Sequence, residues 1–232
     1  VTELQLQSQF RCNGSDGYLA WLDNVLGIRD TANIDLSGIN YDFRVIDSPE
    51  ELHRIIIGKN APNNKSRLVA GYCWKWVSQY DPGTYDIEIG DFKARWNLKS
   101  DGQTWIIKPN SVNEVGCIHT CQGLELDYVG VIIGPDFVVR DGRVITDATK
   151  RASTDKSVWG YKKMLKENPE QAKAIGDMIV KNTYRTLMTR GMKGCYIYCT
   201  DPETQQYFKD LLQKPLDRTI FSSSDIGASI TE

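Results

Sequence analysis

The sequence has 232 residues, of which 41% are hydrophobic and 25% charged, as in an ordinary soluble globular protein with one sizeable core. Its formal net charge of −2 excludes an overall basic character, so a nucleic-acid binder of this composition needs a local basic patch or a basic partner domain. The longest apolar run, Val129 to Ile133, is far shorter than the roughly 18 residues of a membrane span, so we expect no membrane partner.

The cysteines indicate a reducing compartment. No CxxC pair occurs, and only two histidines are present, so we expect buried free thiols in a cytoplasmic protein rather than a zinc site. The amino terminus is polar and lacks the apolar core of a secretory signal. Because the chain begins with Val1 rather than Met, we expect a segment cut from a longer protein.

The first third of the chain predicts alternating helices and strands. Apolar spacing predicts a helix over 17–27, with Asp16 as its N-cap, and a strand over 41–46. Ser48 and Pro49 start a second helix that runs to about residue 59. An apolar run then predicts a buried strand over 67–74.

Residues 75–113 form a different kind of segment, rich in turn signals and tryptophan. We expect a small β-rich excursion from the core domain, made of short strands and loops. The tryptophans there are expected to pack within the excursion, although exposed ones would be able to stack bases. They are Trp74, Trp76, Trp96 and Trp105.

The remaining elements follow the same alternation. We predict strands over 115–119, 128–133 and 194–199, a hairpin over 137–145 with an Asp-Gly turn, and helices over 161–167, 169–189 and 202–212. Residues 147–160 are polar and expected to be mobile, and 213–232 read as a loose tail. Acidic neighbours dilute the basic residues of this part, which favours a solvated face over a phosphate track. Those basic residues are Lys150, Arg151, Lys156, Lys162, Lys163 and Lys166.

Strands that are apolar on both faces and alternate with helices predict a mostly parallel sheet covered on both sides. The fold class is therefore α/β, with residues 1–212 as one domain that carries the excursion. Open sheets of this kind bind ligands beyond the carboxyl ends of their strands. The stretch VGCIHTCQGLELDYVGV places polar groups after such a strand, and Gly123 allows a tight turn or close approach of a ligand to the backbone.

This stretch resembles motif V of superfamily 1 helicases, with a pattern near T-x-H-x-x-Q/K-G-x-E-x-x-x-V. The matching residues are His119, Gln122, Gly123, Glu125 and Val129, while Cys117 stands at the leading Thr. The resemblance implies that His119 and Thr120 contact nucleic acid and that Gln122, Gly123 and Glu125 face the nucleotide cleft. A structural histidine at 119 and a turn-capping role for Glu125 remain open alternatives.

The stretch NTYRTLMTRGMKGCYIY is similar to helicase motif VI. Matching residues occur in order at Tyr184, Thr189, Arg190, Lys193 and Tyr196, with Gly191 in place of the family's Ala. The resemblance implies that Arg190 is an arginine finger, a fixed guanidinium that neutralises charge on the transferring γ-phosphoryl group. Arg185 is a weaker candidate, and a simple helix-capping role for Arg190 is the alternative.

The amino-terminal stretch LQLQSQFRCNGS resembles motif IV, with Arg11 at the position of a second arginine that reaches the γ-phosphate. The three motifs occur in family order. The residues of the motif V and motif VI stretches resemble even more closely a bacterial family of Schlafen-group-3-like DNA/RNA helicase domains, and this resemblance covers about residues 1–212. This resemblance implies a three-layer RecA-like fold of the P-loop NTPase type, and specifically the second RecA-type domain of a helicase.

The phosphate-binding half of such a motor is absent from the sequence. No G-x-x-x-x-G-K-[ST] motif and no strand ending in an Asp-Glu pair occurs. We expect ATP and Mg²⁺ to bind only with an amino-terminal P-loop domain that this chain lacks, and the isolated chain to be inactive. DNA or RNA is the expected second partner. The alternative is a degenerate helicase-like module for nucleic-acid binding or regulation; a nuclease is disfavoured, because no carboxylate cluster has metal-ligand spacing.

Overall fold

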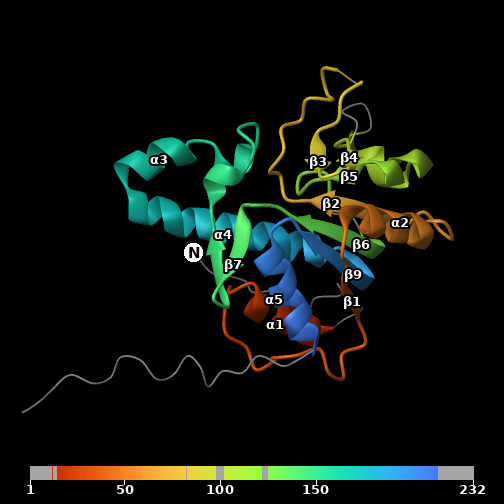
Figure 1. Ribbon diagram of the computed structural model, residues 1–232, viewed down its shortest axis with the longest axis horizontal. Helices are drawn as coiled ribbons and strands as arrows, with labels where there is room; N and C mark the ends of the chain where they lie inside the picture. The colour runs from red at the N-terminus through yellow and green to blue at the C-terminus, as the bar shows by residue number, and fades with distance from the viewer. Residues whose placement is uncertain (1–11, 13–14, 82, 98–101, 122–124, 214–232) are drawn as a thin grey trace, which may run out of the picture.

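The computed structural model describes residues 12, 15–81, 83–97, 102–121 and 125–213 (Figure 1). Its centre is a five-stranded sheet in which every pairing is parallel, in the order β1-β9-β6-β2-β5. The strands are β1 (Asp42–Val45), β9 (Gly191–Cys199), β6 (Leu126–Ile133), β2 (Ser66–Ala70) and β5 (Val115–Gly116). The predicted α/β class with a mostly parallel sheet is confirmed.

Helices cover both faces of this sheet, which gives the three layers of a RecA-like domain. On one face, α2 (Pro49–Asn60) packs on β2, β6 and β9. On the other lie α1 (Asp16–Val25), α4 (Pro169–Met188) and α5 (Pro202–Gln213).

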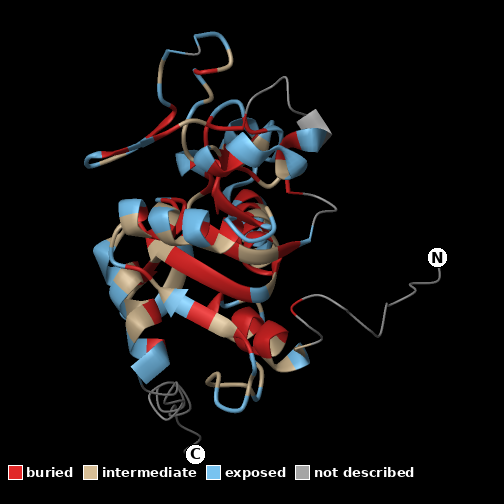
Figure 2. Ribbon diagram, turned by 90° about the vertical axis from the view of Figure 1, so that its right-hand side faces the viewer, coloured by how far each residue is buried: buried red, intermediate tan, exposed pale blue. Residues whose placement is uncertain are grey.

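Successive residues of β6 serve opposite cores: Ile132 belongs to the cluster of α2, and Val131 to the cluster of α1, α4 and α5. Figure 2 shows the buried residues gathered along the strands and on the inner sides of the helices. The two-sided apolar character of the strands is therefore a consequence of the two helix layers.

Local sequence signals explain several element boundaries. The Ser48 side chain accepts a hydrogen bond from the Glu51 amide at the start of α2, as predicted. The hairpin β7 (Phe137–Arg140) and β8 (Arg143–Thr146) turns at Asp141 and Gly142, whose φ angles of 50° and 71° suit a primed two-residue turn. The predicted cap of α1 is wrong by one residue, because Ser15 rather than Asp16 accepts from the Tyr18 amide.

The predicted excursion is present as a two-stranded antiparallel sheet, β3 (Ile87–Ile89) and β4 (Phe92–Ala94), followed by the 3-10 helices Gly102–Ile107 and Pro109–Asn113. Figure 1 shows it beside β2 and β5, away from α1 and α5. Trp96 and Trp105 are buried, and Trp74 and Trp76 pack half-buried on the core of this region, so packing is confirmed as their role. The predicted strand over 115–119 is shorter, because the chain turns after Gly116.

The prediction that residues 147–160 are mobile is wrong, because this segment is ordered and packed against the domain. They form the 3-10 helices Ala148–Lys150 and Lys156–Val158, and the Ala152 amide donates to the Tyr72 carbonyl beyond the end of β2. Arg151 and Asp155 are buried, so Arg151 does not belong to a solvated basic face. The segment leads into α3 (Tyr161–Glu167), which packs along α4.

The buried face of α4 also differs in part from the predicted one. Helical spacing in the sequence predicts Met178 and Asn182 near the same face as Ala172 and Leu187, but both are exposed, whereas Val180, Thr183 and Tyr184 are buried. All six cysteines are free thiols, as predicted, and five of them are buried. Among the described residues, no helix combines the length and the apolar character that crossing a bilayer requires.

Candidate functional site

The predicted site residues fall at two opposite edges of the parallel sheet. Arg190 and Glu125 immediately precede β9 and β6, at the amino edge, where the central strands begin. His119 and Thr120 follow β5, at the carboxyl edge, where the strands end. Arg11, Gln122 and Gly123 lie outside the described residues.

The amino edge brings together the segments that carry all three motifs. Arg190 lies between α4 and β9, and its carbonyl accepts a hydrogen bond of 3.1 Å from the Leu126 amide at the start of β6. The Cys12 thiol, next to Arg11 in sequence, donates to the Thr189 carbonyl at 3.7 Å. Burial raises the pKa of the Cys121 thiol, and the positive charge of nearby Arg190 opposes that rise. The loop after β5 therefore also reaches the neighbourhood of Arg190.

The side chain of Arg190 lies inside this junction rather than on its surface. Arg190 is only 6% exposed, whereas Glu125 is exposed. The Arg190 amide donates to the Leu187 carbonyl at the end of α4, so its backbone closes the last turn of the helix. The structure thus fixes the backbone position of Arg190. Contact with a phosphate requires its guanidinium to become accessible.

Gly191 explains the departure from the family's alanine after this arginine. A Cβ atom at Gly191 would lie 2.1 Å from the carbonyl oxygen of Gly194 and 3.1 Å from the Val129 nitrogen. These neighbours are backbone atoms of β9 and β6, which cannot swing aside as a side chain can. The close approach that positions Arg190 therefore needs glycine.

Arg185, the weaker finger candidate, is committed to a structural contact. Its guanidinium pairs with Asp23, which is nearly fully buried on α1 and also accepts from Arg29 at 2.8 Å. Arg185 thus ties α4 to α1. Lys193, another motif residue, pairs with Asp127 at 2.8 Å on the surface.

At the carboxyl edge, His119 and Thr120 are held by neighbours from other segments. The His119 Nε2 atom lies 3.4 Å from the Asp155 Oδ1 atom, and its side chain is 48% exposed. The Thr120 hydroxyl donates to the Asn97 side-chain oxygen at 2.7 Å. His119 therefore has a structural partner in Asp155, and part of its side chain is also exposed. Its contact with nucleic acid stays a prediction.

A buried charge cluster at this edge was missed by the sequence analysis. Arg151 donates through Nε to Asp155 at 2.6 Å and through Nη1 to the Thr183 hydroxyl at 3.0 Å, and Nη1 lies 3.7 Å from Asp136. All three charged side chains are 0% exposed. The available signals were the Gly-Pro-Asp sequence after β6 and the four-residue spacing of Arg151 and Asp155.

The pKa values of the two carboxyl groups in this cluster are shifted in opposite directions. Burial raises the pKa of Asp136 above its ordinary value, although Arg151 and the donated hydroxyl of Tyr184 both oppose the rise. Burial also acts to raise the pKa of Asp155, but hydrogen bonds from His119 and Ser157 and the charge of Arg151 outweigh it, so that pKa lies well below its ordinary value. Asp155 is therefore the carboxylate that Arg151 mainly compensates.

The motif tyrosine Tyr184 links this cluster to the sheet. Its hydroxyl accepts from the Gly134 amide at 2.9 Å and donates to Asp136. A Cβ atom at Gly71, just beyond β2, would lie 2.0 Å from that hydroxyl. The motif VI helix therefore reaches both edges, with Tyr184 near the carboxyl ends of β2 and β6 and Arg190 at the amino end of β9.

Comparison with known proteins agrees with this arrangement. Residues 1–201 match the family model described as Schlafen group 3, DNA/RNA helicase domain. The chain belongs to the Schlafen group 3 helicase-domain family. It is also 26% identical over 216 residues to the uncharacterized protein YPL245W of Saccharomyces cerevisiae, covering 87% of this chain and 46% of that protein. The chain thus spans about half the length of that relative, and no solved structure matches it.

Within this Schlafen group 3 domain, the described residues contain no group of three or more His, Cys, Asp or Glu side chains placed to hold a metal ion. The buried carboxylates Asp136 and Asp155 face Arg151 instead. These buried acidic side chains are thus arranged around an arginine and do not fit a bound metal ion. What the domain offers at its amino edge is an arginine and the backbone of three motif segments.

Proposed function

We propose that this chain is the second motor domain of a nucleic-acid-dependent ATPase of the helicase type. Arg190 and Arg11 would act on the γ-phosphate of ATP held by an amino-terminal P-loop domain, with Gln122, Gly123 and Glu125 beside the nucleotide. The observation that carries the proposal is the meeting of the three motif segments at the amino edge, through Cys12, Leu126 and Arg190. Membership of a DNA/RNA helicase-domain family supports it.

Arg190 is suited to this role by the rigidity of its surroundings. It lies at the junction of the 20-residue helix α4 with the central strand β9, so its backbone is fixed by a helix end and by the pairing to β6. A fixed guanidinium stabilises charge on a transferring phosphoryl group without reorganisation during the reaction. Because Arg190 is buried in this chain, docking of the P-loop domain must also uncover it.

The loop between β5 and β6 supplies a route from nucleotide to nucleic acid. It leaves the carboxyl edge with His119 and Thr120 and arrives at the amino edge with Glu125. Under the proposal, His119 and Thr120 contact the nucleic-acid backbone, so movement of the nucleotide cleft is transmitted along one short loop. ATP and Mg²⁺ would be held by the P-loop domain.

The decisive test uses the full-length protein that contains this chain and its upstream domain. We expect Arg190→Ala to lower nucleic-acid-stimulated ATP turnover by about 10³-fold or more, the range known for arginine fingers, while ATP binding is retained. Arg54→Ala serves as the control, because Arg54 is an exposed arginine on α2 whose ion pair is with Glu51 of the same helix. Turnover at the wild-type rate in Arg190→Ala would rule out the finger.

A second candidate function is favoured by the burial of Arg190. An arginine that is only 6% exposed is also what a degenerate module would keep for structure alone. Such a module would bind nucleic acid or regulate a partner without unwinding. In the same experiment it predicts no stimulated turnover in the wild-type protein, together with retained nucleic-acid binding.

A further inference from the structure

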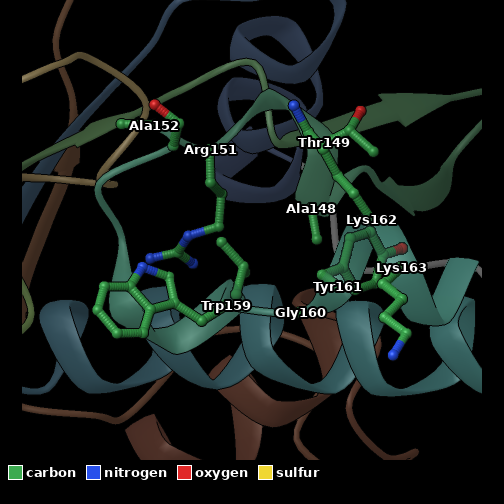
Figure 3. Close-up of a pocket in the computed structure, with 11 residues that line it drawn as sticks. Ala148, Thr149, Arg151, Ala152, Trp159, Gly160, Tyr161, Lys162 and Lys163 are labelled. Atoms are coloured by element: carbon green, nitrogen blue, oxygen red, sulfur yellow. The ribbon is translucent and has the colours of Figure 1, made fainter.

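A pocket of about 190 Å³ opens beside α3, outside the sites assigned above (Figure 3). Its walls come from residues 148–153, which precede the buried Asp155, and from residues 158–163, which enter α3. The lining residues with polar or charged side chains include Thr149, Ser153, Arg151, Tyr161, Lys162 and Lys163, and Trp159 also lines the pocket. No Asp or Glu is among the residues that line it.

Arg151 carries an unused donor beneath this pocket. Its Nε and Nη1 atoms are engaged by Asp155 and Thr183, whereas Nη2 is buried without a hydrogen-bond partner among the described residues. A buried guanidinium donor without an acceptor costs free energy, which an anion in the pocket would recover. Because the side chain is fully covered, direct contact with Nη2 requires a small shift of the pocket wall.

The distribution of charge favours an anion. Lys162 and Lys163 are exposed on the first turn of α3, where Lys163 also lies 3.8 Å from Glu167. Arg151 lines the pocket from inside with a guanidinium that Asp155 already engages through Nε. Asp136 and Asp155 contact Arg151 but do not line the pocket. Figure 3 shows Arg151 entering from the 148–152 segment, and Lys162 and Lys163 coming from α3.

The volume of the pocket and the exposure of Trp159 indicate which class of anion fits it. The pocket is smaller than the roughly 300 to 1,000 Å³ that encloses a whole small-molecule ligand, so it suits a phosphate group whose remaining parts lie outside. The Trp159 side chain stands at the rim and is 67% exposed, unlike the packed tryptophans of the excursion. Exposed indoles beside lysines are the usual platform for bases of a single strand.

We propose that this pocket binds a backbone phosphate of a single nucleic-acid strand, with the adjoining base stacked on Trp159. Asp155 links the pocket residue Arg151 to the predicted contact residue His119, because it bonds both. The strand would thus run from His119 across Asp155 to α3 along the carboxyl edge. This inference rests on the proposed function and extends its nucleic-acid site to residues outside the helicase motifs.

The test measures binding of fluorescein-labelled oligo(dT) and oligo(rU), each of about 12 nucleotides, to the 232-residue chain by fluorescence anisotropy across a salt series. Trp159→Ala is expected to weaken binding about tenfold, through loss of one stacked base. The double variant Lys162→Gln/Lys163→Gln is expected to lower the slope of log affinity on log salt by about 0.7 per lost phosphate contact.

The matched control is Lys166→Gln/Lys173→Gln, which removes the same charge from exposed positions on α3 and α4 outside the pocket. It is expected to change affinity much less than the pocket variant. Because the altered side chains are exposed, urea midpoints should stay unchanged, which separates binding from folding.

Three outcomes would overturn the proposal. Unchanged affinity in Trp159→Ala and in the pocket double variant would exclude the pocket as a binding site. The proposed function is tested separately, by the ATP turnover of Arg190→Ala. Absence of oligonucleotide binding by the wild-type chain would exclude the pocket as well. Competition by AMP or ATP as strong as by unlabelled oligonucleotide would assign the pocket to a free nucleotide instead of a strand.

Discussion

The two edges of the central sheet hold their arginines in different ways. At the amino edge, Arg190 sits where three motif segments meet through backbone contacts. At the carboxyl edge, Arg151 is held by two buried carboxylates, Asp136 and Asp155. The contrast teaches that burial alone does not indicate a role, because one buried arginine belongs to a cluster with two carboxylates and the other lies where the motif segments meet.

The largest expected effect tests the claim that the carboxyl edge is stabilised by charge compensation. Arg151→Met keeps much of the side-chain volume but leaves two buried carboxylates without their cation, and we expect a loss of about 3–5 kcal/mol in the free energy of unfolding. Urea unfolding of the 232-residue chain measures it. The control Arg54→Met, at an exposed pair, should cost about 0.5 kcal/mol or less.

A loss below about 1 kcal/mol in Arg151→Met would contradict this picture, because breaking a buried ion pair costs several times more. Such a result would mean that water or protons already compensate Asp136 and Asp155. The two edges would then differ in composition but not in energetics.

The next effect tests the claim that the amino edge depends on backbone proximity. Gly191→Ala places a Cβ atom 2.1 Å from the Gly194 carbonyl oxygen, and we expect a loss of about 1–3 kcal/mol, the usual cost of overpacking. Gly58→Ala on α2 is the matched change, because its Cβ would meet nothing within 4 Å. It should gain roughly 0.5–1 kcal/mol from helix propensity. Equal unfolding midpoints for the two variants would refute the tight junction directly after Arg190.

The smallest effect concerns the acid limb of stability. The pKa of Asp155 is lowered in the folded protein, so its contribution is present above the unfolded value near 4 and is lost as pH falls toward the folded value. Asp136 has a raised pKa, and its protonation therefore favours the native state on acidification.

We thus expect Asp155→Asn to cost about 1–2 kcal/mol near neutral pH, where Arg151 keeps Asp136 as a balanced partner. The difference from the wild type should shrink below about pH 4. Unfolding curves between neutral pH and the acid limit measure it. A difference that is constant with pH would show that Asp155 contributes through packing rather than through its charge.

Much of the fold was predictable because its signals are local. Ser48 and Pro49 predicted the start of α2, the Asp141-Gly142 turn predicted a hairpin, and apolar runs predicted β2 and β6. The errors arose where position in three dimensions overrides local pattern. The polar segment 147–160 looked mobile, yet it carries Arg151 into the protein, because the partners that neutralise this arginine include Asp136 from beyond β6.

For the candidate site too, the sequence predicted some features and not others. Arg190, His119 and Glu125 were singled out by the resemblance of their stretches to helicase motifs V and VI. The arrangement that separates Arg190 from His119 was not readable, since it depends on the order β1-β9-β6-β2-β5 and on the short crossing between β5 and β6.

By itself, the sequence determined the class of fold, because that class depends on periodicity, caps and residue spacing. It also pointed to the candidate arginine, through the resemblance of its stretch to a helicase motif. Only the tertiary structure decided which arginine is compensated by buried acids, which tryptophan stays exposed, and which edge of the sheet each motif occupies. The physical reason is that the environment of a charge or an indole comes from residues far apart in the chain. Their meeting depends on how the layers pack, and this information is spread over the whole sequence.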